Sequence, residues 1–149
     1  MKIDKVLVPL DGSRLAEMAL PKATALLGDS PSATLLLLRA VRATTLPGID
    51  PLEAQAALVR EAESYLEDVA ARLRDEGMAQ VMTSVWYSDA APAIVEAADV
   101  RHVDLIVMST HGRGGLRRMV RGSVAESVLR DTPTPILLVS AGGAEVKHD

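Results

Sequence analysis

The sequence predicts an α/β fold, in which a parallel, open sheet of five strands is covered by helices on both faces in a Rossmann-like arrangement. Five short runs rich in valine, leucine and isoleucine alternate along the 149 residues with four segments of helical periodicity. One of these runs, residues 33–40, holds four consecutive leucines without polar alternation, which is typical of a strand covered on both faces. Because parallel strands need crossover connections, this alternation favours a single sheet covered by its own helices.

The start of the chain is expected to hold a strand, a turn and a helix. The strand is predicted at residues 5–10, and residues 11–13 (Asp-Gly-Ser) are types that favour a turn. Apolar residues then recur at helical spacing over residues 13–27. Pro21 lies inside this segment and cannot donate to the carbonyl of Glu17, so we predict a kinked helix.

A long helix is expected in the middle of the chain. Asp50 is a suitable N-cap, Pro51 fits the first helical position, and Glu53 follows three residues after the cap. This helix is expected to end at Gly77. Periodicity predicts the remaining elements as strands at 81–87, 105–108 and 136–139, and helices at 91–98 and 123–130.

The length favours one domain, which we expect to span residues 1–140 and to be followed by a flexible tail at residues 141–149. No apolar run approaches the ~18 residues that are needed to cross a bilayer. The first residues lack the apolar core and cleavage site of a signal peptide. We therefore expect a cytoplasmic protein without a membrane anchor.

Composition excludes several classes of function. The absence of cysteine excludes disulfides, thiolate metal sites and a cysteine nucleophile. An aromatic content of 2% and a net charge of −4 argue against a nucleic-acid-binding module. No cluster of histidine and carboxylate residues has metal-ligand spacing, so no dedicated metal site is expected. Ser123 lacks a nucleophile elbow and an identifiable base, so no catalytic residue is assigned.

Residues 112–123 carry the residue types that bind phosphate. Gly112, Gly114 and Gly115 allow backbone amides to approach an oxyanion, and Gly122 and Ser123 open a helix whose positive end favours negative charge. The segment also holds four arginines, which suit bidentate contacts with phosphate: Arg113, Arg117, Arg118 and Arg121. The alternative is structural, since residues 123–126 also form a capping box and an arginine-rich loop can simply be solvated.

Four segments together resemble the universal stress protein family, and they cover essentially the whole chain: Val6 to Ser13, Asp104 to Arg113, Gly122 to Ala125, and Pro133 to Val139. The ATP-binding branch of that family carries glycine, two residues, glycine, nine residues, and glycine followed by serine or threonine. Gly112, Gly122 and Ser123 fit this pattern, whereas Ser109 occupies the first glycine position.

The resemblance implies a sheet of strand order 3-2-1-4-5, of the adenine nucleotide alpha hydrolase-like type, with ATP over the carboxyl ends of the first and fourth strands. It implies that Asp11 lies near the ribose and the metal, and that Val41 lies by the adenine. Mg²⁺ would be carried by the nucleotide. The full set of expected cofactor-binding residues is Pro9, Asp11, Val41, Ser109, His111, Gly112, Arg113, Gly115, Gly122, Ser123 and Val124.

The resemblance further implies a stress-response regulatory protein that forms a homodimer through residues 136–139 and whose protein partner is unknown. Two alternatives remain open. A slow ATP hydrolase would need a general base, for which Asp11 and His111 are the candidates. A nucleotide-free dimer would instead bind an acidic partner through its arginine-rich loop. Adenine nucleotide that copurifies with the protein would exclude this last alternative.

Overall fold

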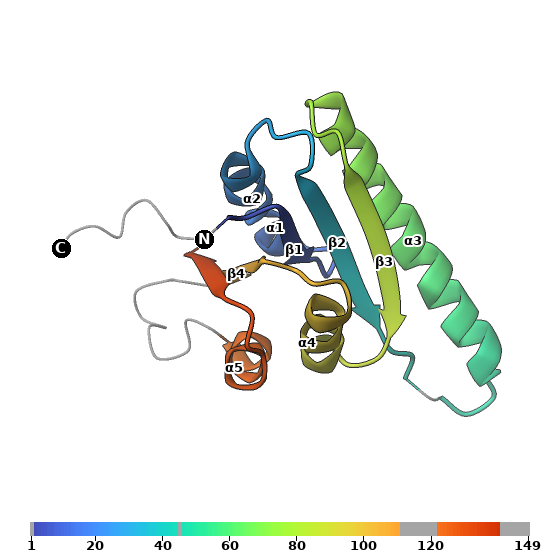
Figure 1. The fold of residues 1–149 in the computed structure, drawn as a ribbon. Coiled ribbons are helices and arrows are strands. Elements are labelled where there is room, and N and C mark those ends of the chain that lie inside the picture. Colours follow the sequence, from blue (N-terminus) through green and yellow to red (C-terminus); the bar gives the residue numbers. More distant parts are fainter. Residues whose placement is uncertain (1, 45, 111–121, 141–149) are drawn as a thin grey trace.

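The computed structural model describes residues 2–44, 46–110 and 122–140, which form a five-stranded parallel sheet between helices (Figure 1). The strand order is β3-β2-β1-β4-β5, so the predicted fold class and order are confirmed. The strands are β1 (Lys5–Pro9), β2 (Thr34–Val41), β3 (Val81–Tyr87), β4 (Leu105–Thr110) and β5 (Ile136–Ser140). The helices are α1 (Arg14–Glu17), α2 (Leu20–Leu27), α3 (Pro51–Asp75), α4 (Ala90–Val100) and α5 (Gly122–Asp131).

The leucines of β2 show why this strand has no polar alternation. Leu35 and Leu37 belong to an apolar cluster on one face of the sheet, whereas Leu36 and Leu38 belong to a second cluster on the other face. All four side chains are at most 1% exposed. Both faces of the strand are therefore core, as expected for a parallel sheet between two helical layers.

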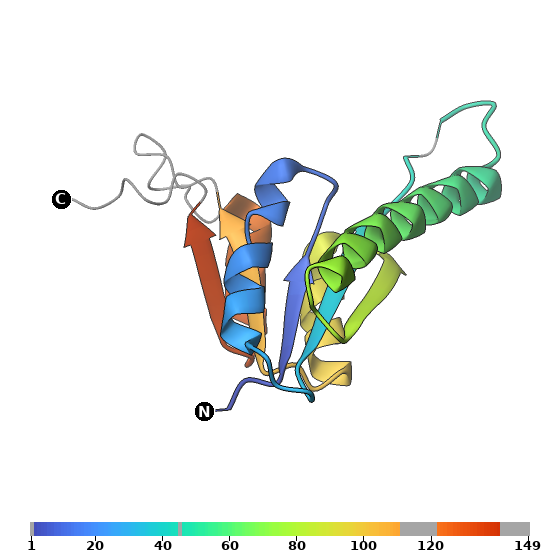
Figure 2. The same cartoon turned by 90° about the horizontal axis from the view of Figure 1, so that it is seen from above.

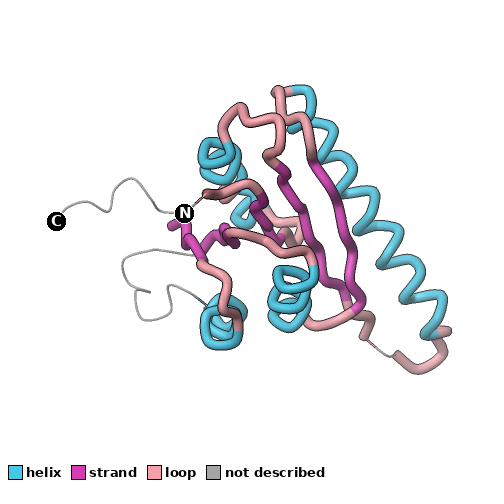
Figure 3. The backbone as a smooth tube through the Cα atoms, in the orientation of Figure 1, coloured by secondary structure: helices cyan, strands magenta, loops and turns pink. Residues whose placement is uncertain are grey.

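The two helical layers divide the helices between the faces of the sheet. The cluster with Leu35 includes buried residues of α2 and α3, and the cluster with Leu36 includes those of α4 and α5. Figure 3 shows helices (cyan) on either side of the strands (magenta). Seen from above, α3 runs past the edge of the sheet (Figure 2). No helix in the described part of the chain is both long and apolar enough to span a membrane.

The segment around Pro21 differs from the prediction of one kinked helix, because the structure has two separate helices, α1 and α2. The amides of Met18 and Ala19 donate to the carbonyls three residues before them, at 3.1 and 3.3 Å, which tightens and ends α1. Pro21 then lies in the first turn of α2, where a missing amide is tolerated. The proline therefore starts a new helix instead of bending a continuous one.

Candidate functional site

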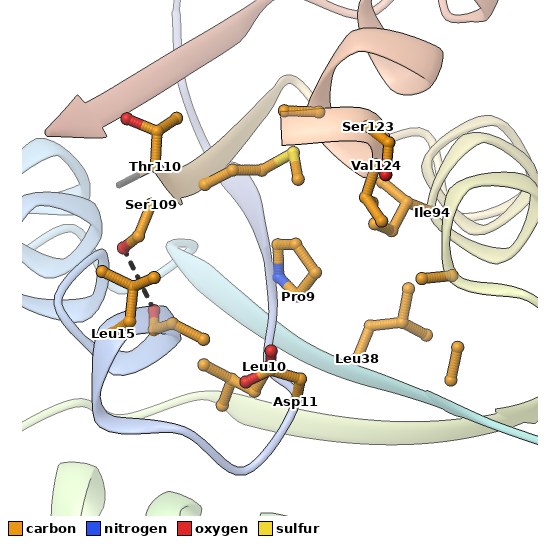
Figure 4. Close-up of a pocket in the computed structure, with 15 residues that line it drawn as sticks. Pro9, Leu10, Asp11, Leu15, Leu38, Ile94, Ser109, Thr110, Ser123 and Val124 are labelled. Atoms are coloured by element: carbon orange, nitrogen blue, oxygen red, sulfur yellow. Dashed lines mark hydrogen bonds between the residues drawn. The ribbon is translucent and has the colours of Figure 1, made fainter. Parts of the chain in front are cut away.

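A cavity of about 340 Å³ opens at the carboxyl ends of β1, β2 and β4 (Figure 4). β1 pairs with β2 on one side and with β4 on the other, so the strand order reverses at β1. Ligands of open α/β sheets bind at such reversal points. The first turns of α4 and α5 complete the wall with Ala90 and Ser123.

One wall of the cavity is apolar. It is formed by Leu38 and Ala40 of β2, Ile94 of α4 and Met108 of β4. Leu38 and Ile94 are nearly fully buried, at 1% and 2% exposure. These side chains can accept the flat apolar face of an aromatic ring. The polar lining residues are spread around the cavity: Ser123 lies beside Ile94, whereas Ser109 and Thr110 lie on the far side (Figure 4).

The start of α5 is the part of the cavity best suited to an anion. Gly122 is the first residue of the helix, and Ser123 and Val124 line the cavity. The amides of a first helical turn have no partner within the helix and carry the positive end of its dipole. Ala90, in the first turn of α4, brings a second helix N-terminus to the same cavity.

Asp11 projects from the turn after β1, at the cavity edge. Its Oδ1 accepts a hydrogen bond from the amide of Ser13 at 2.9 Å, and the residue is exposed. Ser13, not Asp11, is the N-cap of α1, because its Oγ accepts from the amide of Ala16 at 3.1 Å. Asp11 therefore stabilises the turn through one oxygen, and in the described part of the chain its Oδ2 has no hydrogen-bond partner.

Ser109 also lines the cavity, but its hydroxyl is directed toward α1 (Figure 4). The Oγ atom donates to the carbonyl of Ala16 at 3.3 Å. The serine at the glycine position of the nucleotide motif thus links β4 to α1.

Thr110 is a polar residue of this cavity that sequence reasoning did not select. It is 3% exposed, and its Oγ1 has no hydrogen-bond partner among the residues that the structure describes. An unpaired buried hydroxyl costs free energy, which an oxygen or nitrogen atom of a ligand could recover. The sequence feature that could have indicated Thr110 is its position at the end of the fourth strand. Successive side chains of a strand point to opposite faces, so Thr110 and Ser109 point in different directions.

The structure brings five of the expected residues together around the cavity: Pro9, Asp11, Ser109, Ser123 and Val124. Val41 ends β2 next to Ala40, which lines the cavity, and strand alternation places the Val41 side chain on the opposite face of the strand. The expected contact of Val41 with the adenine stays a prediction. Gly122 opens α5, whereas His111, Gly112, Arg113 and Gly115 lie outside the described residues.

Within residues 2–44, 46–110 and 122–140, no group of three or more histidine, aspartate or glutamate side chains is placed to hold a metal ion. The apolar wall, the carboxylate at the edge and the helix N-termini instead suit an organic anion. An adenine nucleotide has this combination of an apolar base, a ribose with hydroxyl groups and a phosphate chain.

Known proteins resemble this chain in sequence and in fold. Residues 2–140 match the sequence model of the Universal stress protein family. Universal stress protein MJ0531 of Methanocaldococcus jannaschii is 30% identical over 140 residues, which cover 91% of this chain and 81% of that protein. A solved member of the family from Burkholderia pseudomallei is 31% identical with a TM-score of 0.74, over 93% of this chain and 96% of the other.

A second solved structure bears on the ligand. It is a universal stress protein in complex with cAMP, and it is 25% identical to this chain. The TM-score is 0.65, and the match covers 94% of this chain and 98% of the other.

Proposed function

The chain belongs to the universal stress protein family, and from that premise we propose that it binds ATP in the cavity between β1 and β4 as a cytoplasmic stress-response module. Binding is its primary activity, and hydrolysis is not part of the proposal. The observation that carries the proposal is the N-terminus of α5, which opens onto the cavity at the reversal of strand order.

The residues that line the cavity support a place for each part of the nucleotide. The adenine would lie on the apolar wall of Leu38, Ala40, Ile94 and Met108, where no charge would be desolvated. The ribose would lie at the cavity edge, where Oδ2 of Asp11 can accept a hydrogen bond from a hydroxyl group.

The phosphates would lie at the start of α5. The sequence of segment 112–121 holds glycines and arginines, residue types whose amides and guanidinium groups bind phosphate. Mg²⁺ would arrive with the nucleotide and neutralise part of its charge. The relative that binds cAMP supports an adenine nucleotide as the ligand class.

Mass spectrometry of the small molecules released on denaturation of the purified protein tests the proposal first. Calorimetry then measures the affinity for ATP and for cAMP. We expect ATP to bind more tightly than cAMP, because only ATP carries a phosphate chain long enough to use several amides and arginines. Tighter binding of cAMP would assign the cavity to the cyclic nucleotide instead.

Two variants separate binding from stability. Gly122→Val should remove ATP binding from a folded protein, because a branched side chain would block approach to the first turn of α5. Asp11→Ala should weaken ATP binding by about tenfold, the usual effect of one hydrogen bond to a charged group. Asp29→Ala is the matched control, since Asp29 is exposed in the connection between α2 and β2, near the amino end of β2 and away from the carboxyl ends that form the cavity. Unchanged ATP affinity in folded Gly122→Val protein would contradict the proposal.

A further inference from the structure

The turn that carries Asp11 rests on an arginine from the next strand. Gly12 adopts a positive φ of 90°, and a Cβ atom added to it would lie 3.2 Å from Nη1 of Arg39. The same atom would lie 3.4 Å from the Cζ and Nη2 atoms of Arg39. Three atoms of the guanidinium are thus nearly equidistant from one point, so the group packs with its face against the backbone of the turn.

Arg39 is held in this place by a polar cluster that joins α1 to α3. Its Cζ lies 5.2 Å from the ring centroid of Tyr65. The Tyr65 hydroxyl donates to Oε2 of Glu17 at 2.5 Å, and Nη2 of Arg72 pairs with Oε1 of the same glutamate at 3.0 Å. Tyr65 and Arg72 come from α3 and Glu17 from α1, so two helices fix the ring on which Arg39 packs.

Arg39 has no hydrogen bond or ion pair of its own to any residue within the described ranges. Strand alternation places its side chain on the face of β2 opposite to Leu38 and Ala40, which line the cavity. It therefore does not reach the cavity wall directly. Its contact is with the turn, one residue after the Asp11 carboxylate.

We propose that Arg39 is a positioning residue, which supports the turn beneath Gly12, holds the Asp11 carboxylate at the cavity edge, and so makes the site select a nucleotide with both ribose hydroxyls over an analogue that lacks one of them. The inference rests on the proposed function, because it assigns a ribose hydroxyl to Asp11. A planar guanidinium suits this role better than an ammonium group, since it can pack against a peptide backbone and a tyrosine ring at once.

A double-mutant cycle between Arg39 and Asp11 tests the inference. Arg39→Met keeps an unbranched side chain that can pack on Tyr65 but removes the planar cation. We expect it to weaken ATP binding by about tenfold in the wild-type background, the effect of misplacing one charged hydrogen bond. In the Asp11→Ala background the same substitution should change affinity by less than about twofold, because the group through which it acts is already gone.

Selectivity supplies a readout that a purely structural role would not move. Two analogues are compared with ATP, 2′-deoxy-ATP and 3′-deoxy-ATP, and wild-type protein should bind the one that lacks the hydroxyl that meets Asp11 less tightly than ATP. The ratio of the dissociation constants of that analogue and of ATP should shrink toward one in Arg39→Met. Arg42→Met is the matched control, because Arg42 lies just after the same strand, is exposed, and pairs only loosely with Asp89 at 3.8 Å. It removes the same charge without touching the turn, and we expect it to leave the ratio unchanged.

The outcomes distinguish the inference from the proposed function. If wild-type protein binds no ATP, both are overturned. If wild-type protein binds ATP, but Arg39→Met weakens binding equally in both backgrounds or leaves the ribose ratio intact, only the role of Arg39 is overturned. Should Arg39→Met fail to fold, Arg39→Lys takes its place in the cycle, and loss of selectivity is again the expected result.

Discussion

Ser109 shows how a single residue can depart from a nucleotide motif without filling the site. Its hydroxyl donates to the carbonyl of Ala16, so the added atoms are directed toward α1. The backbone at the end of β4 remains beside the cavity, where a glycine would also place it. The hydroxyl therefore contributes to the packing of α1 on β4, a structural role.

Ser109→Ala should lower the free energy of unfolding by about 1 kcal/mol at most, the usual value of one hydrogen bond, because the Ala16 carbonyl loses the Ser109 hydroxyl but keeps the Ala19 amide as a donor. ATP affinity should stay within about twofold of wild type. Urea denaturation and calorimetry measure the two effects. Ser109→Gly should cost a further ~0.5 to 1 kcal/mol of stability through backbone freedom. A tenfold loss of ATP affinity in Ser109→Ala would assign the hydroxyl to a phosphate instead.

Tyr65 couples the cluster beneath the turn to pH. Burial raises the pKa of its hydroxyl above the ordinary value of 10.0, and the hydrogen bond to Glu17 raises the pKa further. The Coulombic effect of Arg39 acts in the opposite direction. The folded protein thus retains this proton at a pH where the unfolded chain has lost it.

Because the folded pKa of Tyr65 is the higher one, its contribution to stability is complete below pH 10 and is lost as pH rises above that value. We expect the free energy of unfolding of wild-type protein to fall above about pH 10 more steeply than that of Tyr65→Phe. Denaturant titrations at a series of pH values measure the two slopes. Tyr87→Phe is the matched control, since the Tyr87 hydroxyl accepts a bond from the exposed Ala43 amide, away from this cluster. Parallel curves for wild type and Tyr65→Phe would contradict the assignment.

The division of one predicted helix into α1 and α2 is the main difference at the scale of elements. Local periodicity is continuous across residues 13–27, but the two helices pack differently: α1 lies against β4, whereas α2 packs mainly against β1 and β2. Pro21 is compatible with a new helix that begins at Leu20, because the first turn of a helix does not need the amide that proline lacks.

Pro21→Ala distinguishes this arrangement from a proline within a helix. As a first-turn residue, Pro21 stabilises the fold by restricting the unfolded chain, so its removal should lower stability by about 0.4 to 1 kcal/mol. A proline that interrupted a helix would give the opposite sign, a gain of up to ~3 kcal/mol. Pro51→Ala, at the first position of α3, is the matched control and should show the same small loss. Thermal and urea denaturation measure both variants.

Elements that depend on local pattern could be predicted from the sequence, whereas contacts across the fold could not. The leucine run of β2 and the cap at Asp50 predicted their elements because burial and capping depend on neighbouring residues. The cluster of Glu17 and Tyr65 joins residues 48 positions apart, and no periodicity signals such a pair. The resemblance placed Val41 by the adenine, but only the structure shows that strand parity turns its side chain to the face opposite Ala40.

At the scale of the whole molecule, one topological feature creates both the cavity and an open edge. The chain builds outward from β1 in two directions, which leaves β5 with a neighbour on one side only among the described strands. All five of its residues are partly exposed. Ile136 and Leu138 pack toward one apolar cluster and Leu137 and Val139 toward the other, so the side chains belong to the core while the outer backbone edge is open. An open edge of this kind can pair with a second copy.

We propose that a homodimer forms through β5, and its ladder geometry identifies the amide to remove. The amide of Ile106 donates to the carbonyl of Pro135 at 2.9 Å, so in a parallel ladder the Leu137 amide faces β4 and the Leu138 amide faces the free edge. Leu138→Pro should therefore leave the β4 pairing in place and turn a dimer into a monomer, because it removes a donor that only a second copy would use. Leu138→Ala is the matched control, since it loses the same packing but keeps the amide, and it should remain a dimer. Sedimentation equilibrium measures both variants at several concentrations. A monomeric wild-type protein, or a dimer that survives Leu138→Pro in folded form, would place the contact between copies elsewhere on the molecule.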